Sequence, residues 1–149
     1  MDGIIELLRS LWITSESSEI ERIIRALIEA ARTDMRAVVD LAVENIKRDQ
    51  FDGSKWSSLA LTLLDTFKGS DEPGMILKAL VDKDQDNGAY LNNFGVFLEM
   101  RGWIGQAIEY YARAYATDYK YHGHEKATTF PAWTNLHRIT SSYVIKPSR

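Results

Sequence analysis

Apolar residues recur at every third or fourth position over most of the chain, which is the spacing of an amphipathic α-helix. The clearest case is residues 88–118, where one helical period ends at Gly102 and a second begins at Ile104. This stretch predicts two helices joined by a tight turn. Because neither helix can bury its apolar face alone, the hairpin also predicts helical neighbours.

The same spacing predicts helices on both sides of this hairpin. They are expected at residues 2–13, 19–32, 35–48, 55–67, 74–81 and 131–143. Ser18 and Glu21 have the spacing of a capping box, and Thr33 or Asp34 is suited to cap the helix that follows. Residues 119–130 predict an irregular connection by their composition. The chain is therefore expected to be all-α, with about seven or eight helices.

Composition supports a folded helical chain and narrows its function. The 149 residues are 45% hydrophobic and 26% charged, as in ordinary globular domains, and only three are prolines. A net charge of −3 argues against a broad phosphate-binding surface. The absence of cysteine excludes a disulfide scaffold, a thiol nucleophile and any zinc site that uses cysteine.

The sequence carries no obvious targeting signal. Residues 1–13 lack the basic start and the unbroken apolar core of a signal peptide, because Glu6 and Arg9 interrupt them. No window of the sequence approaches the length of apolar residues that a membrane span requires. We expect a cytoplasmic protein with no membrane partner.

Two short motifs contain metal-ligand residue types: Asp82, Asp84 and Asp86, and His122, His124 and Glu125. The alternating aspartates are similar to the start of a calcium loop, but the twelfth position is Asn93, so the bidentate carboxylate is missing. The paired histidines lie in the segment expected to be irregular and exposed to solvent. We expect no metal and no other cofactor.

Neither catalysis nor nucleic-acid binding finds support in the motifs. The order and spacing of Ser, His, Asp and Gly residues match no catalytic or phosphate-binding pattern, so we expect no enzyme. Five tyrosines are candidates for stacking on single-stranded nucleic acid: Tyr110, Tyr111, Tyr115, Tyr119 and Tyr121. Few basic residues accompany them, which favours a core and interface role.

The hairpin at 88–118 carries a recognisable set of key positions. They are Leu91, Phe94, Gly95 and Leu98 in its first helix, and Ala107, Tyr111 and Ala114 in its second. In kind and spacing they resemble the tetratricopeptide repeat (TPR) family. Tyr119 stands where a proline usually closes the family's unit, so the exit of this repeat is less constrained than the family pattern.

The resemblance extends to about residues 53–143. Trp56 lies 35 residues before Leu91, and Trp133 lies 42 residues after it, which fits a 34-residue period with insertions. We read one strong repeat, at 88–119, flanked by degenerate copies. The positions expected in the repeat core are Trp56, Leu59, Ala60, Phe94, Gly95, Ala107, Tyr111, Ala114, Trp133 and Leu136.

The resemblance implies a fold and a binding surface. The fold would be a right-handed α-solenoid of stacked hairpins, in one compact domain. Residues 1–50 would form an N-terminal helical cap or degenerate repeat, and 51–149 the repeats. The first helix of each repeat would line a concave groove, whose candidate residues are Ser57, Leu61, Asn92, Asn93, Val96, Glu99, Asn135 and Arg138.

Two functions follow from this interpretation. The resemblance implies a protein–protein interaction module that binds a peptide or protein segment in the groove, as an adaptor, chaperone-like factor or assembly factor. The alternative is a structural subunit that forms homo-oligomers without a peptide ligand. In that case the apolar helix at 4–13 and the incomplete last repeat would complete one another between two copies.

Overall fold

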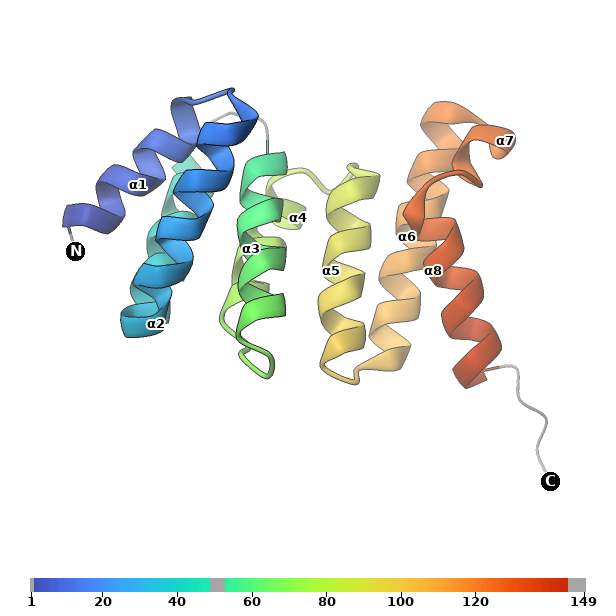
Figure 1. Cartoon of the computed structure of the whole chain (residues 1–149). Helices are drawn as coiled ribbons and strands as arrows, with labels where there is room; N and C mark the ends of the chain where they lie inside the picture. The colour runs from blue at the N-terminus through green and yellow to red at the C-terminus, as the bar shows by residue number, and fades with distance from the viewer. Residues whose placement is uncertain (1, 49–52, 145–149) are drawn as a thin grey trace. The chain divides into compact units, whose positions relative to one another are not determined.

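The computed structural model describes residues 2–48 and 53–144. The described residues are 85% helical and form eight α-helices and no strand (Figure 1). This confirms the all-α prediction. The helices are α1 (Asp2–Ile13), α2 (Ser17–Arg48), α3 (Ser54–Thr66), α4 (Pro73–Lys83), α5 (Gly88–Met100), α6 (Ile104–His122), α7 (His124–Ala127) and α8 (Pro131–Ile139), and a π-helical turn (Thr140–Val144) follows α8.

The long helix α2 contains the boundary that the sequence predicted near residue 34. Asp34 has non-helical backbone angles, with φ −149° and ψ 78°, so α2 is two helical segments joined at a kink. Its carboxylate accepts a hydrogen bond from the Ala37 N–H at 3.1 Å, which is how an N-cap satisfies a free backbone donor. The predicted cap is confirmed. The first segment begins at Ser17, two residues before the expected start at 19.

The prediction of an irregular connection over residues 119–130 is wrong for 119–127 and holds only for 128–130, which form a turn before α8. Helix α6 continues to His122, and the short helix α7 follows at once. The residues after 118 are polar and aromatic, but none of them breaks a helix until Gly123. That glycine has φ 82°, a left-handed conformation that other residues rarely adopt, and the helical path ends there.

The backbone contacts divide the chain into two compact units, with the boundary in the sequence between Lys83 and Asp84. In unit 1, α2 packs on α1, α3 and α4, and α3 packs on α4. In unit 2, α6 packs on α5, α7 and α8. The sequence-based boundary at 50/51 lies within residues 49–52, outside the described residues, and stays a prediction. The solenoid arrangement also stays a prediction.

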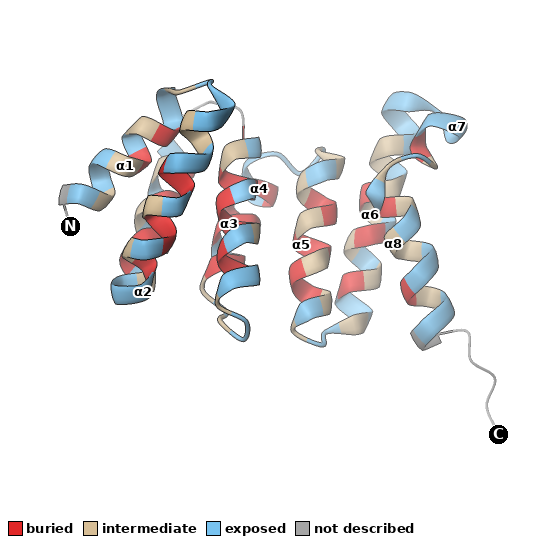
Figure 2. Cartoon of the chain, in the orientation of Figure 1, coloured by how far each residue is buried: buried red, intermediate tan, exposed pale blue. Residues whose placement is uncertain are grey.

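Each unit has its own apolar core, visible as the red faces of the helices in Figure 2. In unit 1, Trp56 is fully buried with Leu59 and Ala60. The Lys55 ammonium donates to the backbone carbonyls of Leu11 at 3.1 Å and Trp12 at 3.0 Å, where α1 ends. This side chain therefore fastens the last turn of α1 to the start of α3.

In unit 2, α5 and α6 approach closely because Gly95 has no side chain. A Cβ placed on Gly95 would lie 2.7 and 2.8 Å from ring carbons of Tyr111, which is fully buried. The remaining repeat-core positions of α5 and α6, Phe94, Ala107 and Ala114, are buried as well. In α8, by contrast, Trp133 and Leu136 are only partly buried, and the Trp133 ring lies 3.9 Å from that of His137.

Candidate functional site

The residues predicted to line a groove lie in both units. Ser57 and Leu61 are on α3, and Ser57 is buried, with 6% of its surface exposed. The other six lie in unit 2, on α5 or α8: Asn92, Asn93, Val96, Glu99, Asn135 and Arg138. The geometry of unit 2 shows that four of these six bind one another.

A hydrogen-bonded network, which we call the brace, joins α5, α6 and α8. Its centre is the Glu99 carboxylate, which accepts two hydrogen bonds from the Arg138 guanidinium, at 2.6 and 2.7 Å. The buried Tyr111 hydroxyl donates to the same carboxylate at 2.8 Å. Asn135 accepts from Arg138 at 3.3 Å and donates to the Asn92 side-chain oxygen at 3.0 Å. The brace thus runs Asn92, Asn135, Arg138, Glu99, Tyr111.

The electrostatics of the brace follow from these contacts. The hydrogen bonds from Arg138 lower the pKa of the Glu99 carboxyl, and the one from Tyr111 adds to this, against the opposing effect of burial. Burial raises the pKa of the Tyr111 hydroxyl, and its bond to Glu99 raises it further. A bidentate guanidinium–carboxylate pair holds the two groups in one relative orientation. The brace therefore fixes α8 against the α5–α6 hairpin, and its polar groups serve the fold.

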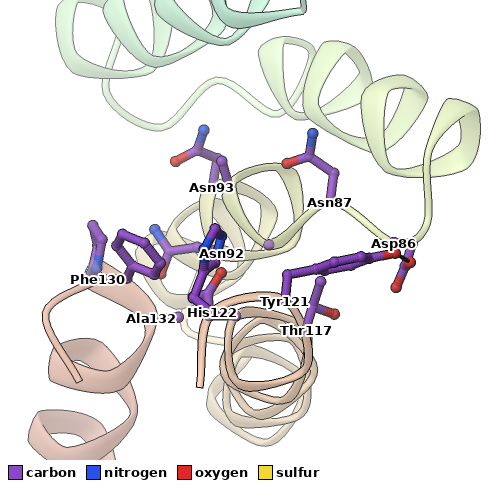
Figure 3. Close-up of a pocket in the computed structure, with 13 residues that line it drawn as sticks. Asp86, Asn87, Asn92, Asn93, Thr117, Tyr121, His122, Phe130 and Ala132 are labelled. Carbon is purple, nitrogen blue, oxygen red and sulfur yellow. Dashed lines mark hydrogen bonds between the residues drawn. The ribbon is translucent and has the colours of Figure 1, made fainter. Parts of the chain in front are cut away.

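The second feature of unit 2 is an open cavity of about 410 Å³ at the N-terminal end of α5 (Figure 3). Its walls come from the start of α5, the end of α6 and the start of α8. The lining residues are Asp86, Asn87, Gly88, Ala89, Asn92, Asn93, Thr117, Asp118, Tyr121, His122, Phe130, Pro131 and Ala132. Asn92 and Asn93 are the only predicted groove residues among them.

The cavity contains two carboxylates that differ in their hydrogen-bond partners and in the direction of their pKa shifts. Asp86 accepts a hydrogen bond from the Tyr121 hydroxyl and faces the Lys120 ammonium at 3.4 Å, and the Tyr121 bond is the main reason that its pKa is lowered. Asp118 is half-buried and accepts no hydrogen bond from the described residues. Burial raises the pKa of the Asp118 carboxyl, and the nearby His122 opposes that shift only in part.

Gly88 allows Asp118 to occupy this position. A Cβ on Gly88 would overlap Asp118 Oδ1 and come within 3.3 Å of the Ala114 carbonyl oxygen. Asn87 caps α5, since its side-chain oxygen accepts the Tyr90 N–H at 3.1 Å. Because Gly88 has no side chain, α6 packs closely against the start of α5, and Asp118 lies on the cavity wall.

Aromatic and amide groups complete the cavity. Figure 3 shows Tyr121 reaching toward Asp86 on one side and Phe130 on the other, with Asn92 and His122 between them. The His122 ring packs edge-on against Phe130, with centroids 5.1 Å apart. Asn92 is 7% exposed and Asn93 is partly exposed. The cavity therefore offers hydrogen-bonding amides between two aromatic walls.

Sequence reasoning missed most of this cavity because it assigned residues 119–130 to an irregular connection. Asp118, Tyr121 and Phe130 come from that region or its border. Recognising that α6 continues to His122 would have placed Asp118 and Tyr121 on one helix. In the described residues, no three His, Cys, Asp or Glu side chains gather in a group that could hold a metal. His124 instead meets the Tyr115 hydroxyl, at 3.1 Å.

Unit 1 has its own depression, of about 460 Å³, between α1 and the second half of α2. Ile5, Leu8, Trp12 and Ile13 line it from α1, together with Leu41 and charged or polar residues of α2. Leu8 is buried, whereas Trp12 is 40% exposed and Ile13 is 70% exposed. Helix α1 thus packs on α2 with one edge and leaves part of its apolar surface open.

The comparisons with known proteins add no family to this description. No family model, curated protein or solved structure matches the chain. Among the described residues, no helix is long and apolar enough to cross a membrane.

Proposed function

We propose that this chain is a protein-interaction module and that the cavity of unit 2 receives an extended segment of a partner protein. The observation that carries the proposal is the combination of a cavity of about 410 Å³ with amide, carboxylate and aromatic groups on packed helices. Protein sites that bind small groups typically have volumes of about 300–1,000 Å³ and a few placed polar groups. A cavity at the low end of that range suits one or two peptide side chains.

A binding role fits the cavity better than a catalytic one. The Thr117 hydroxyl donates to the Arg113 carbonyl at 2.9 Å, and His122 packs on Phe130. No hydrogen bond joins Thr117, Asp118 and His122 in this part of the described structure. A nucleophile aligned with a base is therefore missing from the lining, whereas groups for recognition are present.

The resemblance to TPR proteins supports the same function. We propose that the packed pairs α3–α4 and α5–α6 are TPR-like hairpins of a right-handed α-solenoid. The close approach at Gly95 and Tyr111 is the kind of packing that a small residue at this repeat position permits. The binding surface proposed here differs from the predicted groove, because Asn92, Glu99, Asn135 and Arg138 bond to one another.

The experiment is a selection followed by a matched pair of variants. A random peptide library displayed on phage is panned against the full chain, and selected peptides are titrated by fluorescence anisotropy. Ala89→Trp places a large ring at the cavity, from an exposed position of α5. Gln106→Trp places the same ring at an exposed position of α6 outside the cavity.

We expect Ala89→Trp to weaken peptide binding about tenfold or more and Gln106→Trp to leave it unchanged. Circular dichroism checks that both variants keep the helical fold. Failure to select any peptide that binds the chain in solution would refute the proposal. Equal affinity of the wild type and Ala89→Trp would refute the cavity as the site.

The exposed apolar edge of α1 favours a second candidate function, self-association. Trp12 and Ile13 are exposed beside the unit 1 depression, and burying such residues against a second copy would remove apolar surface from water. Sedimentation velocity of the wild type and of Ile13→Lys tests this. A concentration-dependent dimer that the substitution abolishes would support it, and a monomer at high micromolar concentration would refute it.

A further inference from the structure

We propose that the cavity of unit 2 selects a lysine or arginine side chain of the partner segment. This inference rests on the proposed function and adds the chemical class of the group that is recognised. It is carried by the charge balance of the cavity, by an amide that lacks an acceptor and by the flanking rings.

The charge balance favours a cation. Two carboxylates line the cavity, and its thirteen lining residues include neither lysine nor arginine. Asp86 already has the Lys120 ammonium and the Tyr121 hydroxyl as partners. Asp118 has no hydrogen-bond donor among the described residues, although it is half-buried. Its electrostatic neighbour His122 offsets the effect of burial only in part, so an incoming ammonium or guanidinium group would compensate the Asp118 carboxylate further.

A second, independent observation concerns Asn92. Its side chain is buried, with 7% of the residue exposed, and it lies on the cavity wall. Its oxygen accepts from Asn135, whereas its amide nitrogen donates to no acceptor in the described residues and is not among their fully buried unsatisfied atoms, so it keeps access to solvent. A ligand can therefore take a hydrogen bond from this amide. A backbone carbonyl of a bound segment would supply the acceptor while the basic side chain reaches Asp118.

The rings suit the remainder of such a side chain. Figure 3 shows Tyr121 and Phe130 on opposite sides of the cavity. Lysine and arginine have aliphatic stems that pack on apolar surface, and their charged ends are attracted to aromatic faces. An acidic side chain has a shorter aliphatic stem, and its carboxylate is not attracted to an aromatic face. The N-terminus of α5 would attract an anion, but Asp86 and Asp118 lie at this end of the helix and oppose one.

The test uses small defined probes and the full, isotopically labelled chain. Nα-acetyl-lysine N-methylamide and its arginine counterpart are titrated while amide chemical shifts are recorded by NMR. The controls are the same lysine compound acetylated on its side chain, which has no charge, and the glutamate counterpart. We expect the two basic probes to shift the resonances of Gly88, the Asn92 side-chain amide and Asp118, and the controls to shift them little.

Two isosteric variants complete the test. Asp118→Asn removes the cavity charge that lacks a hydrogen-bond donor among the described residues, and Glu109→Gln removes one charge from an exposed position of α6 outside the cavity. We expect Asp118→Asn to weaken binding of the basic probes about three- to tenfold and Glu109→Gln to leave it unchanged. Equal shifts with the acetylated or glutamate probe, or unchanged binding to Asp118→Asn, would overturn the inference.

Failure of the cationic preference can be distinguished from failure of the proposed function. If phage-selected peptides bind and lose affinity in Ala89→Trp, but tolerate replacement of every lysine and arginine by glutamine, the interaction function stands and the cationic preference is refuted. If no peptide is selected, the proposed function fails, and with it the inference that the cavity reads a peptide side chain.

Discussion

Two carboxylates, one near each end of helix α5, have opposite surroundings. At the C-terminal end, the Glu99 carboxylate receives two hydrogen bonds from Arg138 and one from Tyr111, so its charge is compensated within unit 2. At the N-terminal end, the Asp118 carboxylate lies on the wall of an open cavity and receives none from the described residues. One carboxylate holds three helices together, whereas the other is available to a ligand.

The position of a polar residue on a helix does not by itself decide whether that residue supports the fold or is left for binding. Asn92, Asn93 and Glu99 lie on one helix, and all three were predicted to line a groove. Glu99 became part of the brace because α8 brings Arg138 to it. Asn93 has no such partner among the described residues, and its side chain borders the cavity. A neighbouring helix decides which polar residues are left for binding.

The largest expected effect on stability comes from the packing beneath the brace. Gly95→Ala places a Cβ 2.7–2.8 Å from the Tyr111 ring, so we expect it to lower the free energy of unfolding by about 1–3 kcal/mol. Gly105→Ala on α6 is the control, because a Cβ there meets nothing within 4 Å. It should be neutral or stabilising by about 0.5–1 kcal/mol, since alanine favours helix. Urea denaturation measures both, and equal destabilisation would contradict the close approach.

The next largest changes in the free energy of unfolding are expected at the two carboxylates. Glu99→Gln removes the charge that pairs with Arg138, and we expect it to cost about 1–2 kcal/mol, allowing for the exposure of the arginine. Asp118→Asn should stabilise the chain at neutral pH, because it removes a half-buried charge that accepts no hydrogen bond from the described residues and whose burial His122 offsets only in part. Urea denaturation at pH 7 gives the sign of each change. Destabilisation by both substitutions would contradict the distinction between brace and cavity.

The two carboxylates should also affect the pH dependence of stability in opposite directions. The folded state lowers the pKa of Glu99, so its stabilising contribution is complete above the unfolded value of 4.5 and is lost as the pH falls through the lower folded value. The folded state raises the pKa of Asp118, so its penalty is present above the folded pKa and is relieved as the pH falls.

We therefore expect Glu99→Gln to make the acid-induced loss of stability shallower and Asp118→Asn to make it steeper. Melting temperatures measured between about pH 3 and pH 7 test this, since that interval contains the ordinary carboxyl pKa values. The opposite order of the two slopes would contradict the assignment of the two pKa shifts.

The smallest expected effect on stability is at Asn93. Its side chain is partly exposed at the cavity and has no hydrogen bond to the described residues, so Asn93→Ala should change the free energy of unfolding by less than about 0.5 kcal/mol. It should nevertheless weaken binding of a selected peptide about threefold or more, as loss of one hydrogen bond does. Urea denaturation and fluorescence anisotropy of the same variant check this. Loss of stability with unchanged binding would show that Asn93 supports the fold, as the brace residues do, and does not bind the peptide.

The helical fold was predictable from local pattern, and the site was predictable only in part. Spacing of apolar residues located the helices, and the short side chain of Asp34 marked the break in α2. The continuation of α6 to His122 was missed because polar and aromatic residues were read as irregular. Pairing of Glu99 with Arg138 joins residues 39 positions apart and depends on where α8 packs, which no local pattern contains.

We expect the partner to bind at the N-terminal end of α5 and not at the brace. Intermolecular NOEs in a complex of the labelled chain with a phage-selected peptide test this. We predict contacts from a lysine or arginine side chain of the peptide to ring protons of Tyr121 and Phe130, with the resonances of Glu99 and Arg138 unshifted. Contacts from the peptide to Glu99 and Arg138, with none at the cavity rings, would contradict the claim.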